Sequence, residues 1–459
     1  MRRAGDATAR WLASRLDRSH AVLCLAGPGN NGGDALATAT ALRAMGRRAD
    51  VVLIGEAAQL PADAAQALRR CHEGGSVATE LPSTTDAVWI VDGLFGIGLG
   101  RPIVDRFAAA VEWTKHQRAQ GRRVLALDVP SGIDADTGAI LGEQAVTADA
   151  TLTFIAAKAG LFTGPAVDLT GEVWIDDLGL SPLTSDPSLA LFDAEAAART
   201  SPVRPRTAHK GLQGDVAIIG GAFGMIGAAL LAARAALRAG AGRVRIGWTT
   251  EAAPTFDPVT PELIFDDLAP LLRRRLHAAC IGCGMGSGGW AAQALRSAIA
   301  LNVPVVFDAD ALNLLAESAE QTSLFQRRKA PSILTPHPAE AARLLGTDAR
   351  SVNADRIRAA RDLARGYGAF VVLKGAGSVI AAPDGRTSIN LTGNPLLATA
   401  GTGDILTGIV GALLAQGLEP WDAARVAVAW HGACADRLAA RGVRRAVAGD
   451  LLPELSMLA

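Results

Sequence analysis

The feature that most constrains this chain is the regular alternation of short apolar runs with alanine- and leucine-rich segments along its length. Apolar runs bounded by glycine and polar residues predict strands buried on both faces of a sheet, and the segments between them have a helical pattern. Strands that alternate with helices form parallel βα units. The sequence therefore predicts an α/β protein with doubly wound sheets.

The pattern runs twice, with a break near residue 190. The strands expected before the break are "AVLCLAG", "ADVVLIG", "AVWIVDG", "RRVLALD" and "DATLTFI". Those expected after it are "GDVAIIGG", "RVRIG", "AACIGCG", "PVVFDAD", "SILTPHP", "FVVLKG" and "SVIAAPDG". The stretch "GLSPLTSDPS" at 179–188 is typical of a linker. We therefore expect two three-layer α/β/α domains, over 1–185 and 205–459, joined by a linker over 186–204.

Composition excludes several classes of protein. Lysine plus arginine equals aspartate plus glutamate, 45 each, and no dense basic run occurs, so we expect no nucleic acid partner. No apolar stretch reaches the roughly 18 residues that a membrane-spanning helix needs. The segment "MRRAGDATARWLASRL" has no apolar core or cleavage site, so it is not a signal peptide. Five scattered cysteines are typical of a reducing compartment, which predicts a cytoplasmic protein.

Three predicted strands of the first half end in polar residues. These residues are Asn30, Asn31, Asp34, Asp92, Asp128 and Ser131. Ligands of such sheets bind beyond the carboxyl ends of the strands, and an acid there is costly unless it is paired or metal-bound. Asn31, Asp92 and Ser131 offer only oxygen ligands, which suit a hard cation. One such residue alone would be interpreted as a cap, but three strand ends at one edge favour a binding site.

The strongest motif of the second half is "NPLLATAGTGDILTGIVGALLAQG", in which Gly401–Asp404 open a long apolar helix. Backbone N–H groups and the helix dipole then point at negative charge that develops there. Asp404 is suited to take a proton from a substrate hydroxyl. Capping of the helix is the alternative for Asp404. The segment Lys374–Ser378 in "VVLKGAGS" is a candidate phosphate cradle.

Two further strand ends of the second half carry ionisable residues. "VVFDADALN" offers Asp308, Asp310 and Asn313, and "ILTPHPAEAARLLG" offers His337 and Glu340. The alternative for His337 is a helix-start residue, and for Glu340 a member of a capping box.

Cys280 and Cys283 form a lone C-x-x-C in "AACIGCGMG". A redox pair or half of a zinc site would use this spacing, but zinc sites usually show a second pair, which the sequence lacks. We interpret both cysteines as small residues at a strand end.

The first half resembles the NAD(P)H-hydrate epimerase family, whose signature is a "GNNGGD" turn, a "DGLFGxGLxRP" loop and a "D-x-PSG" strand end, over about residues 1–175. The resemblance implies a Rossmann-like epimerase domain. The residues implied to hold the hydrated dinucleotide are Asn30, Asn31, Gly32, Gly33, Asp34, Gly96, Ile97, Gly98, Leu99, Gly100, Arg101, Pro102 and Asp128. It also implies a potassium ion (K⁺) held by Asn31, Asp92 and Ser131.

Epimerisation inverts the hydroxyl-bearing carbon beside the ring nitrogen, so the hydroxyl must leave and return on the other face with proton transfer. A positioned carboxylate suits this step, and we expect Asp128 to be the acid/base. Lys158 is a weaker candidate that could equally be a surface lysine. Ala35 replaces the usual glycine of the family. The family also carries a stretch before the residues that match "RAGDATARWL". Because the given sequence does not contain that stretch, we expect quaternary packing and epimerase activity to be affected.

The second half resembles the ribokinase-like superfamily and, within it, the ADP-dependent NAD(P)H-hydrate dehydratases. "HKG", "TPHP-x-E", "LKG-x-x-S" and "GTGD" occur in this order over about residues 205–455. The residues implied to contact the adenine nucleotide are Lys374, Gly375, Ala376, Gly377, Ser378 and Gly403. Those implied to contact the hydrated cofactor are Ala229, Gly284, His337 and Asp404. The departures from the family pattern are Cys283 for proline, Ala339 for glycine, and Leu396–Leu397 for Gly-Met.

A kinase fold can dehydrate because a phosphoryl group turns a poor leaving group, hydroxide, into a good one. We expect Asp404 to be the base, ADP the phosphoryl donor and Mg²⁺ the counter-charge that phosphoryl transfer requires. The expected partners are NADH hydrate, NADPH hydrate, ADP and further copies of this chain.

Two rival functions stay open on the sequence alone. The first is a ribokinase-like small-molecule hydroxyl kinase with a non-catalytic N-terminal binding domain, which "GTGD" fits equally but "TPHP-x-E" does not favour. The second is a non-enzymatic binding module of the kind found in RNA-decapping scaffolds. Retention of Asn31, Asp92, Asp128 and Ser131 argues against the second.

Overall fold

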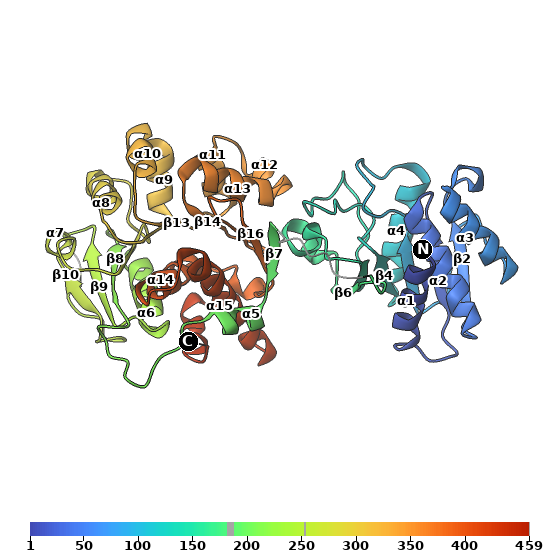
Figure 1. Ribbon diagram of the computed structural model, residues 1–459, viewed down its shortest axis with the longest axis horizontal. Coiled ribbons are helices and arrows are strands. Elements are labelled where there is room, and N and C mark those ends of the chain that lie inside the picture. Colours follow the sequence, from blue (N-terminus) through green and yellow to red (C-terminus); the bar gives the residue numbers. More distant parts are fainter. Residues whose placement is uncertain (181–187, 252–253, 459) are drawn as a thin grey trace. The chain divides into compact units, whose positions relative to one another are not determined.

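A computed structural model describes residues 1–180, 188–251 and 254–458 of the chain. The chain divides into two compact units, Met1–Asp186 and Pro187–Ala459, and each is described by itself (Figure 1). Within the described ranges no helix is long and apolar enough to cross a bilayer.

The first unit alternates strands and helices. Its elements are α1 Arg2–Ala13, β1 Val22–Ala26, α2 Asn30–Ala44, β2 Ala49–Leu53, η1 Ala57–Gln59, α3 Ala62–Glu73, β3 Trp89–Gly93, α4 Asp105–Ala119, β4 Arg123–Leu127, β5 Ala150–Phe154, η2 Ala159–Phe162, η3 Gly164–Asp168 and β6 Glu172–Asp176. The strands form one parallel sheet in the order β2-β1-β3-β4-β5-β6. The order reverses between β1 and β3, so a ligand site is expected at their carboxyl ends.

The side chains of β1 show how the three layers of the first unit arise. Alternate residues of a strand point to opposite faces. Cys24 packs in a cluster with residues of α1, α2 and α3, whereas Leu23 and Leu25 pack in another with Ala110 and Val111 of α4. Both faces of the sheet are therefore buried, which explains why the run "AVLCLA" is apolar throughout.

The second unit is larger. Its elements are β7 Leu189–Phe192, α5 Ala194–Thr200, β8 Asp215–Gly220, α6 Ile226–Arg238, β9 Arg243–Trp248, β10 Ile264–Asp266, α7 Leu268–Leu271, β11 Ala278–Ile281, α8 Gly289–Ile299, β12 Val305–Phe307, α9 Asp310–Glu317, α10 Ala319–Gln326, β13 Ser332–Leu334, α11 Pro338–Leu345, α12 Ala349–Ala354, α13 Arg356–Tyr367, β14 Phe370–Leu373, β15 Val379–Ala381, β16 Thr387–Asn390, η4 Pro395–Leu397, α14 Thr402–Ala415, α15 Pro420–Ala440, η5 Ala448–Asp450 and α16 Leu451–Leu455.

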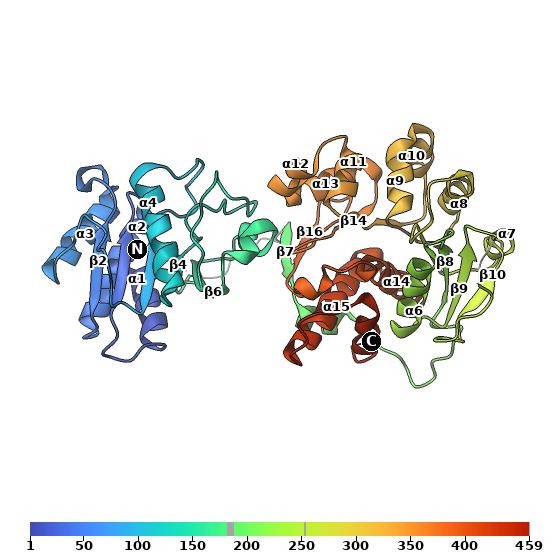
Figure 2. The same cartoon turned by 180° about the vertical axis from the view of Figure 1, so that it is seen from behind.

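Its strands form a sheet in the order β10-β9-β8-β11-β12-β13-β14-β15-β16-β7. The pairs from β10 to β14 are parallel, whereas β15 is antiparallel to both of its neighbours. Helices α6, α14 and α15 cover one face of this sheet and α10, α11 and α13 lie on the other (Figures 1 and 2). The sequence-based expectation of three-layer α/β/α units is confirmed.

The predicted strands are found in both units, but four observed strands were missed. Edge strand β6 has exposed residues, β10 and β16 are short and partly polar, and β7 is a four-residue run next to the proline- and serine-rich stretch. The expected linker over 186–204 was too long. Both β7 and α5 fall within this range. Strand β7, "LALF", gains its hydrogen bonds by pairing with β16, which lies far along the chain, and α5 packs against α15. Residues 181–187 of the proline- and serine-rich stretch lie outside the described residues.

Helices α6 and α14 pack closely because small residues line their contact. A Cβ atom added at Gly408 would lie 2.0 Å from the carbonyl oxygen of Ala232 in α6. Ala229, Ala232 and Ala236 on α6 are fully buried. The contact positions the N-terminus of α14, and therefore Asp404, against the carboxyl edge of the sheet.

We predict that Gly408→Ala lowers the free energy of unfolding of the second unit by about 1–3 kcal/mol, because the added methyl overpacks a backbone contact. Gly227→Ala is the matched control, since it lies on α6 with nothing within 4 Å of the added Cβ. That control should be neutral or stabilising by up to about 1 kcal/mol, because alanine favours helix. Urea denaturation measures both, and equal stability of the two variants would contradict the packing argument.

Candidate active sites

The residues predicted at three strand ends of the first unit lie together. The backbone N–H and the hydroxyl of Ser131 donate to the Asp92 carboxylate at 2.9 and 2.7 Å. The Asn31 amide donates to the carbonyl oxygen of Phe95 at 2.8 Å, and the N–H of Phe95 donates to Ser131 Oγ at 2.8 Å. Hydrogen bonds thus join groups from β3, the loop after it, the start of α2 and the turn after β4.

Asp92 is the fully buried member of this cluster. Burial raises the pKa of Asp92 to about 6, although hydrogen bonds from Ser131 and Leu94 oppose the shift. A buried carboxylate surrounded by hydroxyl, amide and carbonyl oxygens is a donor set that a hard monovalent cation fits. The arrangement is consistent with the predicted ligands Asn31, Asp92 and Ser131.

Asp128 lies directly after β4 with a φ of 64°, a conformation uncommon for residues other than glycine. Its Oδ1 atom is 2.6 Å from Lys158 Nζ and accepts a hydrogen bond of 3.0 Å from the Thr153 hydroxyl. Both charged side chains are mostly but not fully buried. Strained backbone that presents a paired acid at a strand end is typical of a functional position. The alternative of a solvated surface lysine for Lys158 is wrong, because its ammonium is engaged by Asp128 and by the carbonyl of Phe154.

The glycines of "GNNGGD" differ in what they permit. A Cβ at Gly32 would lie 2.0 Å from the carbonyl oxygen of Gly27, so Gly32 lets α2 begin tightly against the preceding turn. A Cβ at Gly33 would meet the side chain of Met1, whose ammonium lies 3.6 Å from Asp34. Burial raises the pKa of Asp34 to about 6, with the Asp128 charge adding to the effect. Asp34 and Asp128 are therefore electrostatic neighbours across the sheet edge.

The loop over residues 96–102 lies beyond this edge. Cβ atoms added at Gly98 and Gly100 would have nothing within 4 Å, and Ile97 is exposed. Leu99 packs against the apolar cluster beside α4, and Pro102 lies against Gly142. The loop is therefore anchored at its later residues and open at its first ones, with Gly96 next to the Asn31 side chain.

In the second unit the central interaction is an ion pair between Asp308 and Lys374. Lys374 Nζ lies 2.7 Å from Asp308 Oδ1 and 3.9 Å from a Glu340 carboxylate oxygen. The Thr407 hydroxyl of α14 donates to Asp308 Oδ2 at 2.8 Å. Burial lowers the pKa of Lys374, but the two carboxylates outweigh it, so the net direction is upward and the lysine stays charged.

Asp404 lies in the first turn of α14, after Gly401, which has a φ of 91°. Burial raises the pKa of Asp404 to about 6, and the nearby charge of Asp308 adds to the effect. The Cys283 Sγ atom lies within 4.8 Å of a carboxylate oxygen of Asp404. The N-cap residue of α14 is Gly401, and Asp404 is the acidic residue of the first turn.

His337 and Glu340 form the capping box that was left open as an alternative. His337 Nδ1 accepts from the backbone of Ala339 at 3.1 Å, and a Glu340 carboxylate oxygen accepts from the backbone N–H of His337 at 2.8 Å. Burial lowers the pKa of His337, and the Lys374 charge lowers it further. The imidazole is half exposed, so the cap fixes a ring that still faces solvent.

The segment after β14 is a tight turn. Gly375 has a φ of 147° and Gly377 a φ of 59°, and the Ser378 hydroxyl donates to the carbonyl oxygen of Gly375 at 3.0 Å. The buried Arg356 guanidinium donates to the carbonyl oxygens of Leu373 and Lys374 at 3.2 Å. A Cβ at Gly375 would lie 2.7 Å from that guanidinium, so the turn needs glycine there. Ala376 belongs to the same turn.

The remaining predicted residues border the same edge. A Cβ at Gly403 would lie 3.4 Å from Lys374 Nζ, which places this glycine beside the ion pair. Gly284, with a φ of 58°, follows Cys283 and packs against the backbone of Met225 at the start of α6. Ala229 is fully buried on α6, with its Cβ close to Gly221. The turn after β8, the turn after β11 and the start of α14 therefore border one another.

Several residues of these sites were not singled out from the sequence. Thr153, Thr407 and Arg356 hold the charged residues in place, but a threonine or arginine within an ordinary helix or strand pattern carries no signal of its own. His431 of α15 is a further example. It is buried, and its Nε2 atom has no partner within the described part of the chain. A polar residue in the apolar pattern "AVAWHGACA" is the signal that could have found it.

The interpretation of Cys280 and Cys283 as small strand-end residues holds for one of them. Cys280 is fully buried, and its thiol donates to the carbonyl oxygen of Thr407 at 3.3 Å, where Gly411 leaves room for the sulfur. Cys283 instead contacts Asp404. Both thiols are free.

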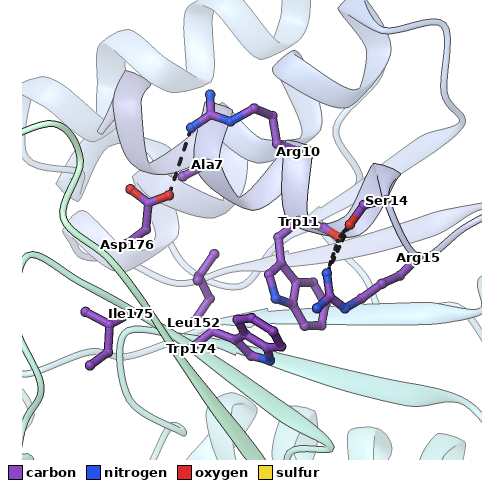
Figure 3. A pocket seen from close by; sticks show the side chains of 9 residues that line it. All are labelled: Ala7, Arg10, Trp11, Ser14, Arg15, Leu152, Trp174, Ile175 and Asp176. Carbon is purple, nitrogen blue, oxygen red and sulfur yellow. Dashed lines mark hydrogen bonds and ion pairs between the residues drawn. The ribbon is translucent and has the colours of Figure 1, made fainter.

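A separate pocket of about 310 Å³ lies in the first unit between α1 and the edge strand β6. Trp11 and Trp174 border it with their rings edge to face, and Arg15 lies over both rings (Figure 3). Arg10 faces Asp176 at 3.9 Å on the other side of the pocket (Figure 3). None of the predicted site residues lines this pocket, and it lies away from the carboxyl ends of β1, β3 and β4.

Each unit thus presents a paired or buried aspartate beside glycine-rich turns at the carboxyl edge of a parallel sheet. This defines the class as a two-domain α/β enzyme with nucleotide-type sites.

Comparisons with known proteins agree with that class. Residues 216–456 match the family model described as NAD(P)H-hydrate dehydratase, and residues 1–160 match that of the YjeF-related protein N-terminus. The bifunctional NAD(P)H-hydrate repair enzyme Nnr of Coxiella burnetii is 40% identical over 475 residues, which cover 100% of this chain and 94% of that protein. The Escherichia coli enzyme of the same name is 38% identical over 100% of this chain and 88% of that protein.

Among solved structures, the ADP/ATP-dependent NAD(P)H-hydrate dehydratase from Bacillus subtilis, co-crystallised with ATP/Mg²⁺, is 33% identical. It covers 59% of this chain and 97% of that chain, with a TM-score of 0.54. The chain belongs to the family of bifunctional NAD(P)H-hydrate repair enzymes, and the resemblance inferred from the sequence motifs is confirmed.

We predict that Ser131→Ala lowers the free energy of unfolding by about 1–3 kcal/mol, because it leaves the buried Asp92 carboxylate short of a hydrogen bond. Ser14→Ala is the control: its hydroxyl donates to the carbonyl of Trp11 at an exposed helix end, and its loss should change stability by less than about 0.5 kcal/mol. Urea denaturation compares the two. A loss at Ser131 no larger than at Ser14 would contradict the role given to the Asp92 cluster.

Proposed function

We propose that this chain repairs hydrated NADH and NADPH by two reactions, one in each unit. The first unit interconverts the R and S hydrates. The second unit dehydrates the S hydrate to NAD(P)H with consumption of ADP and release of AMP and phosphate. The observation that carries the proposal is the match, over the whole chain, to enzymes named for this repair. Asp128 in the first unit and Asp404 in the second lie at the sites where this repair needs an acid/base.

In the first unit Asp128 is proposed as the acid/base of epimerisation. Its carboxylate is held by Lys158 and Thr153, so one oxygen is fixed and the other is left to face the substrate. Lys158 is a positioning residue in this scheme, because its ammonium, 2.6 Å from Oδ1, orients the Asp128 carboxylate. The turn Asn30–Asp34 at the N-terminus of α2 and the loop Gly96–Pro102 are proposed to hold the dinucleotide, since helix N-termini bind phosphate.

A potassium ion is proposed to bind at Asn31, Asp92 and Ser131. The donor set is entirely oxygen, and the buried Asp92 carboxylate gains a counter-charge that the described residues around it do not supply. When bound, the ion supplies positive charge beside the substrate's phosphates. The residues of the chain do the remaining work of orienting the ring toward Asp128.

In the second unit Asp404 is proposed to take the proton from the hydroxyl of the hydrate while that oxygen attacks the terminal phosphorus of ADP. AMP leaves, the carbon–oxygen bond breaks as the ring nitrogen's lone pair forms an iminium, and phosphate departs. Loss of a proton from the neighbouring ring carbon to solvent then forms the carbon–carbon double bond of NAD(P)H and returns the lone pair to nitrogen. The N–H groups at Gly401–Gly403 stabilise the charge that develops. The nucleotide is proposed to lie against Lys374–Ser378 and Gly403, and the hydrate against Ala229, Gly284, His337 and Asp404.

Mg²⁺ is proposed to accompany the nucleotide. The carboxylate of Asp308 is a hard oxygen donor at the same edge, and Mg²⁺ binds through one or two carboxylates together with substrate phosphates. The ion supplies neutralising charge for the transferred group. ADP is the proposed donor, and the use of ATP by this chain is a question for the assay.

The rival of a hydroxyl kinase with a non-catalytic first unit is less well supported, because the first unit keeps Asp128 in a paired and strained position. We also propose a cytoplasmic location, because five free cysteines are typical of a reducing compartment. A homo-oligomeric state is a further proposal. A chain with no net formal charge is also expected to have no nucleic acid partner. The proposed limits of the two activities are the two compact units, Met1–Asp186 and Pro187–Ala459.

Two variants separate the activities. We expect Asp404→Asn to abolish dehydration, by about 10²-fold or more, because an amide cannot accept the proton, with nucleotide affinity largely unchanged. Asp128→Asn should abolish epimerisation and leave dehydration of the S hydrate intact, so each variant controls for the other. The return of NADH absorbance with ADP and each purified epimer measures both. Loss of both activities in either variant would contradict the assignment.

The pH dependence of dehydration follows from Asp404. Because burial raises the pKa of Asp404 to about 6, the base becomes protonated as pH falls through that value. We expect kcat/KM for dehydration to decline about tenfold per pH unit below about 6 and to be level above it. A profile that stays level to pH 4, or that declines already above pH 7, would exclude Asp404 as the base.

A further inference from the structure

Three side chains of metal-ligand type converge where the turn after β11, the end of β12 and the start of α14 meet. The Sγ atom of Cys283 and carboxylate oxygens of Asp308 and Asp404 all lie within 4.8 Å of one another. Cys283 and Asp308 are buried, and Asp404 is partly buried. The set combines one sulfur with two carboxylates, so it differs from a cluster of acids on a surface.

We propose that Cys283, Asp308 and Asp404 form a binding site for a thiophilic divalent cation of the zinc class, and that its occupancy stops the reaction of the second unit. Zinc binds thiolate at about 2.3 Å and carboxylate oxygen at about 2.0–2.2 Å. Around one tetrahedral zinc ion these bond lengths place the ligand atoms about 3.4–3.6 Å apart. A set within 4.8 Å reaches that geometry through small side-chain rotations.

The charges around the three ligands favour a cation. Asp310 adds to the negative field at Asp404, and Glu340 lies on the other side of Lys374. Lys374 carries the positive charge that faces these carboxylates, and it is already engaged by Asp308. A divalent cation compensates the remaining excess of negative charge. Lys374 also limits the affinity, since its ammonium repels the ion.

Asp308 can ligate without leaving its present partners. Lys374 occupies one side of Oδ1 and Thr407 one side of Oδ2, and each carboxylate oxygen has a second lone pair. The backbone of Cys283 is held by a hydrogen bond from Gly221 at 3.1 Å, so its sulfur stays beside Asp404. On binding, the thiol loses its proton to solvent and the sulfur donates a lone pair to the metal. No electrons are transferred.

The sulfur makes the site selective. Thiolate ligands favour zinc-class ions, whereas Mg²⁺ takes oxygen ligands, keeps several waters and binds through substrate phosphates. A bound zinc-class ion ties up the carboxylate of Asp404 that the proposed dehydration needs as a base. This inhibitory consequence rests on the proposed function, but the binding itself does not. Epimerisation in the first unit should continue, because it uses other residues.

Binding is tested with Co²⁺ on the full chain, because a thiolate–Co²⁺ pair gives a charge-transfer absorption band that oxygen ligands do not give. The wild type and Cys280→Ala should show the band with equal affinity. Cys283→Ala and Cys283→Ser should lack it and bind Co²⁺ at least about 10–100-fold more weakly, which is the loss that perturbing even the supporting groups of a metal site causes. Absence of the band in the wild type, or its retention in both Cys283 variants, would overturn the proposal.

Inhibition is tested with Zn²⁺ on the same proteins, with the metal-free activity of each variant as its own reference. Zn²⁺ should inhibit dehydration by the wild type and by Cys280→Ala, and the same sample should still epimerise. The Zn²⁺ concentration for half inhibition should rise at least about tenfold in the Cys283 variants. Equal inhibition of wild type and Cys283 variants would overturn the inhibitory role. If neither protein dehydrates the hydrate at all, the proposed function fails, and the Co²⁺ band still decides whether the site exists.

Discussion

The second unit depends on the buried ion pair between Asp308 and Lys374. The pair joins the ends of β12 and β14, and Thr407 ties it to α14. A buried charge without a partner costs several kcal/mol. Removal of either side chain would therefore destabilise the fold, because the other would stay buried and unpaired. The strained residue Ala309, with a φ of 48°, turns the chain between Asp308, which faces inward, and Asp310, which accepts from the backbone of Gly286. Burial is the main cause of the raised pKa of Asp404, and the negative charges of Asp308 and Asp310 add to it.

In the first unit, hydrogen bonds in place of an ion pair stabilise the buried carboxylate. Asp92 is fully buried and is held by the backbone and hydroxyl of Ser131, while Asp128 is paired with Lys158 nearer the surface. The two aspartates therefore differ in role: one is enclosed among oxygen donors that suit an ion, and the other is oriented but accessible. In both units a shared carboxyl edge brings residues from distant parts of the chain within hydrogen-bond distance.

Much of this organisation could be predicted, because its signals are local. Strands buried on both faces are continuous apolar runs, and residues just after them must lie at one edge of a parallel sheet. Sequence-based prediction was less successful where an element is determined by residues elsewhere in the chain. Strand β7 is a strand because β16 pairs with it, and no property of "LALF" shows this. The opposite holds for His337 and Glu340, whose spacing predicted the capping box that the structure contains. Cys283 was interpreted as a small strand-end residue, since no local pattern shows that its sulfur meets Asp404.

The sequence by itself determined the family, the α/β class, the two-part organisation and the candidate residues at the strand ends, because these follow from periodicity and from motifs within a few residues of one another. Only the tertiary structure decided which charged groups are partners: Asp128 with Lys158, Asp308 with Lys374 and Thr407, and Asp404 with Cys283. The physical reason is that desolvation and Coulomb interaction depend on distance in space and on burial, and neither quantity is a function of separation along the chain.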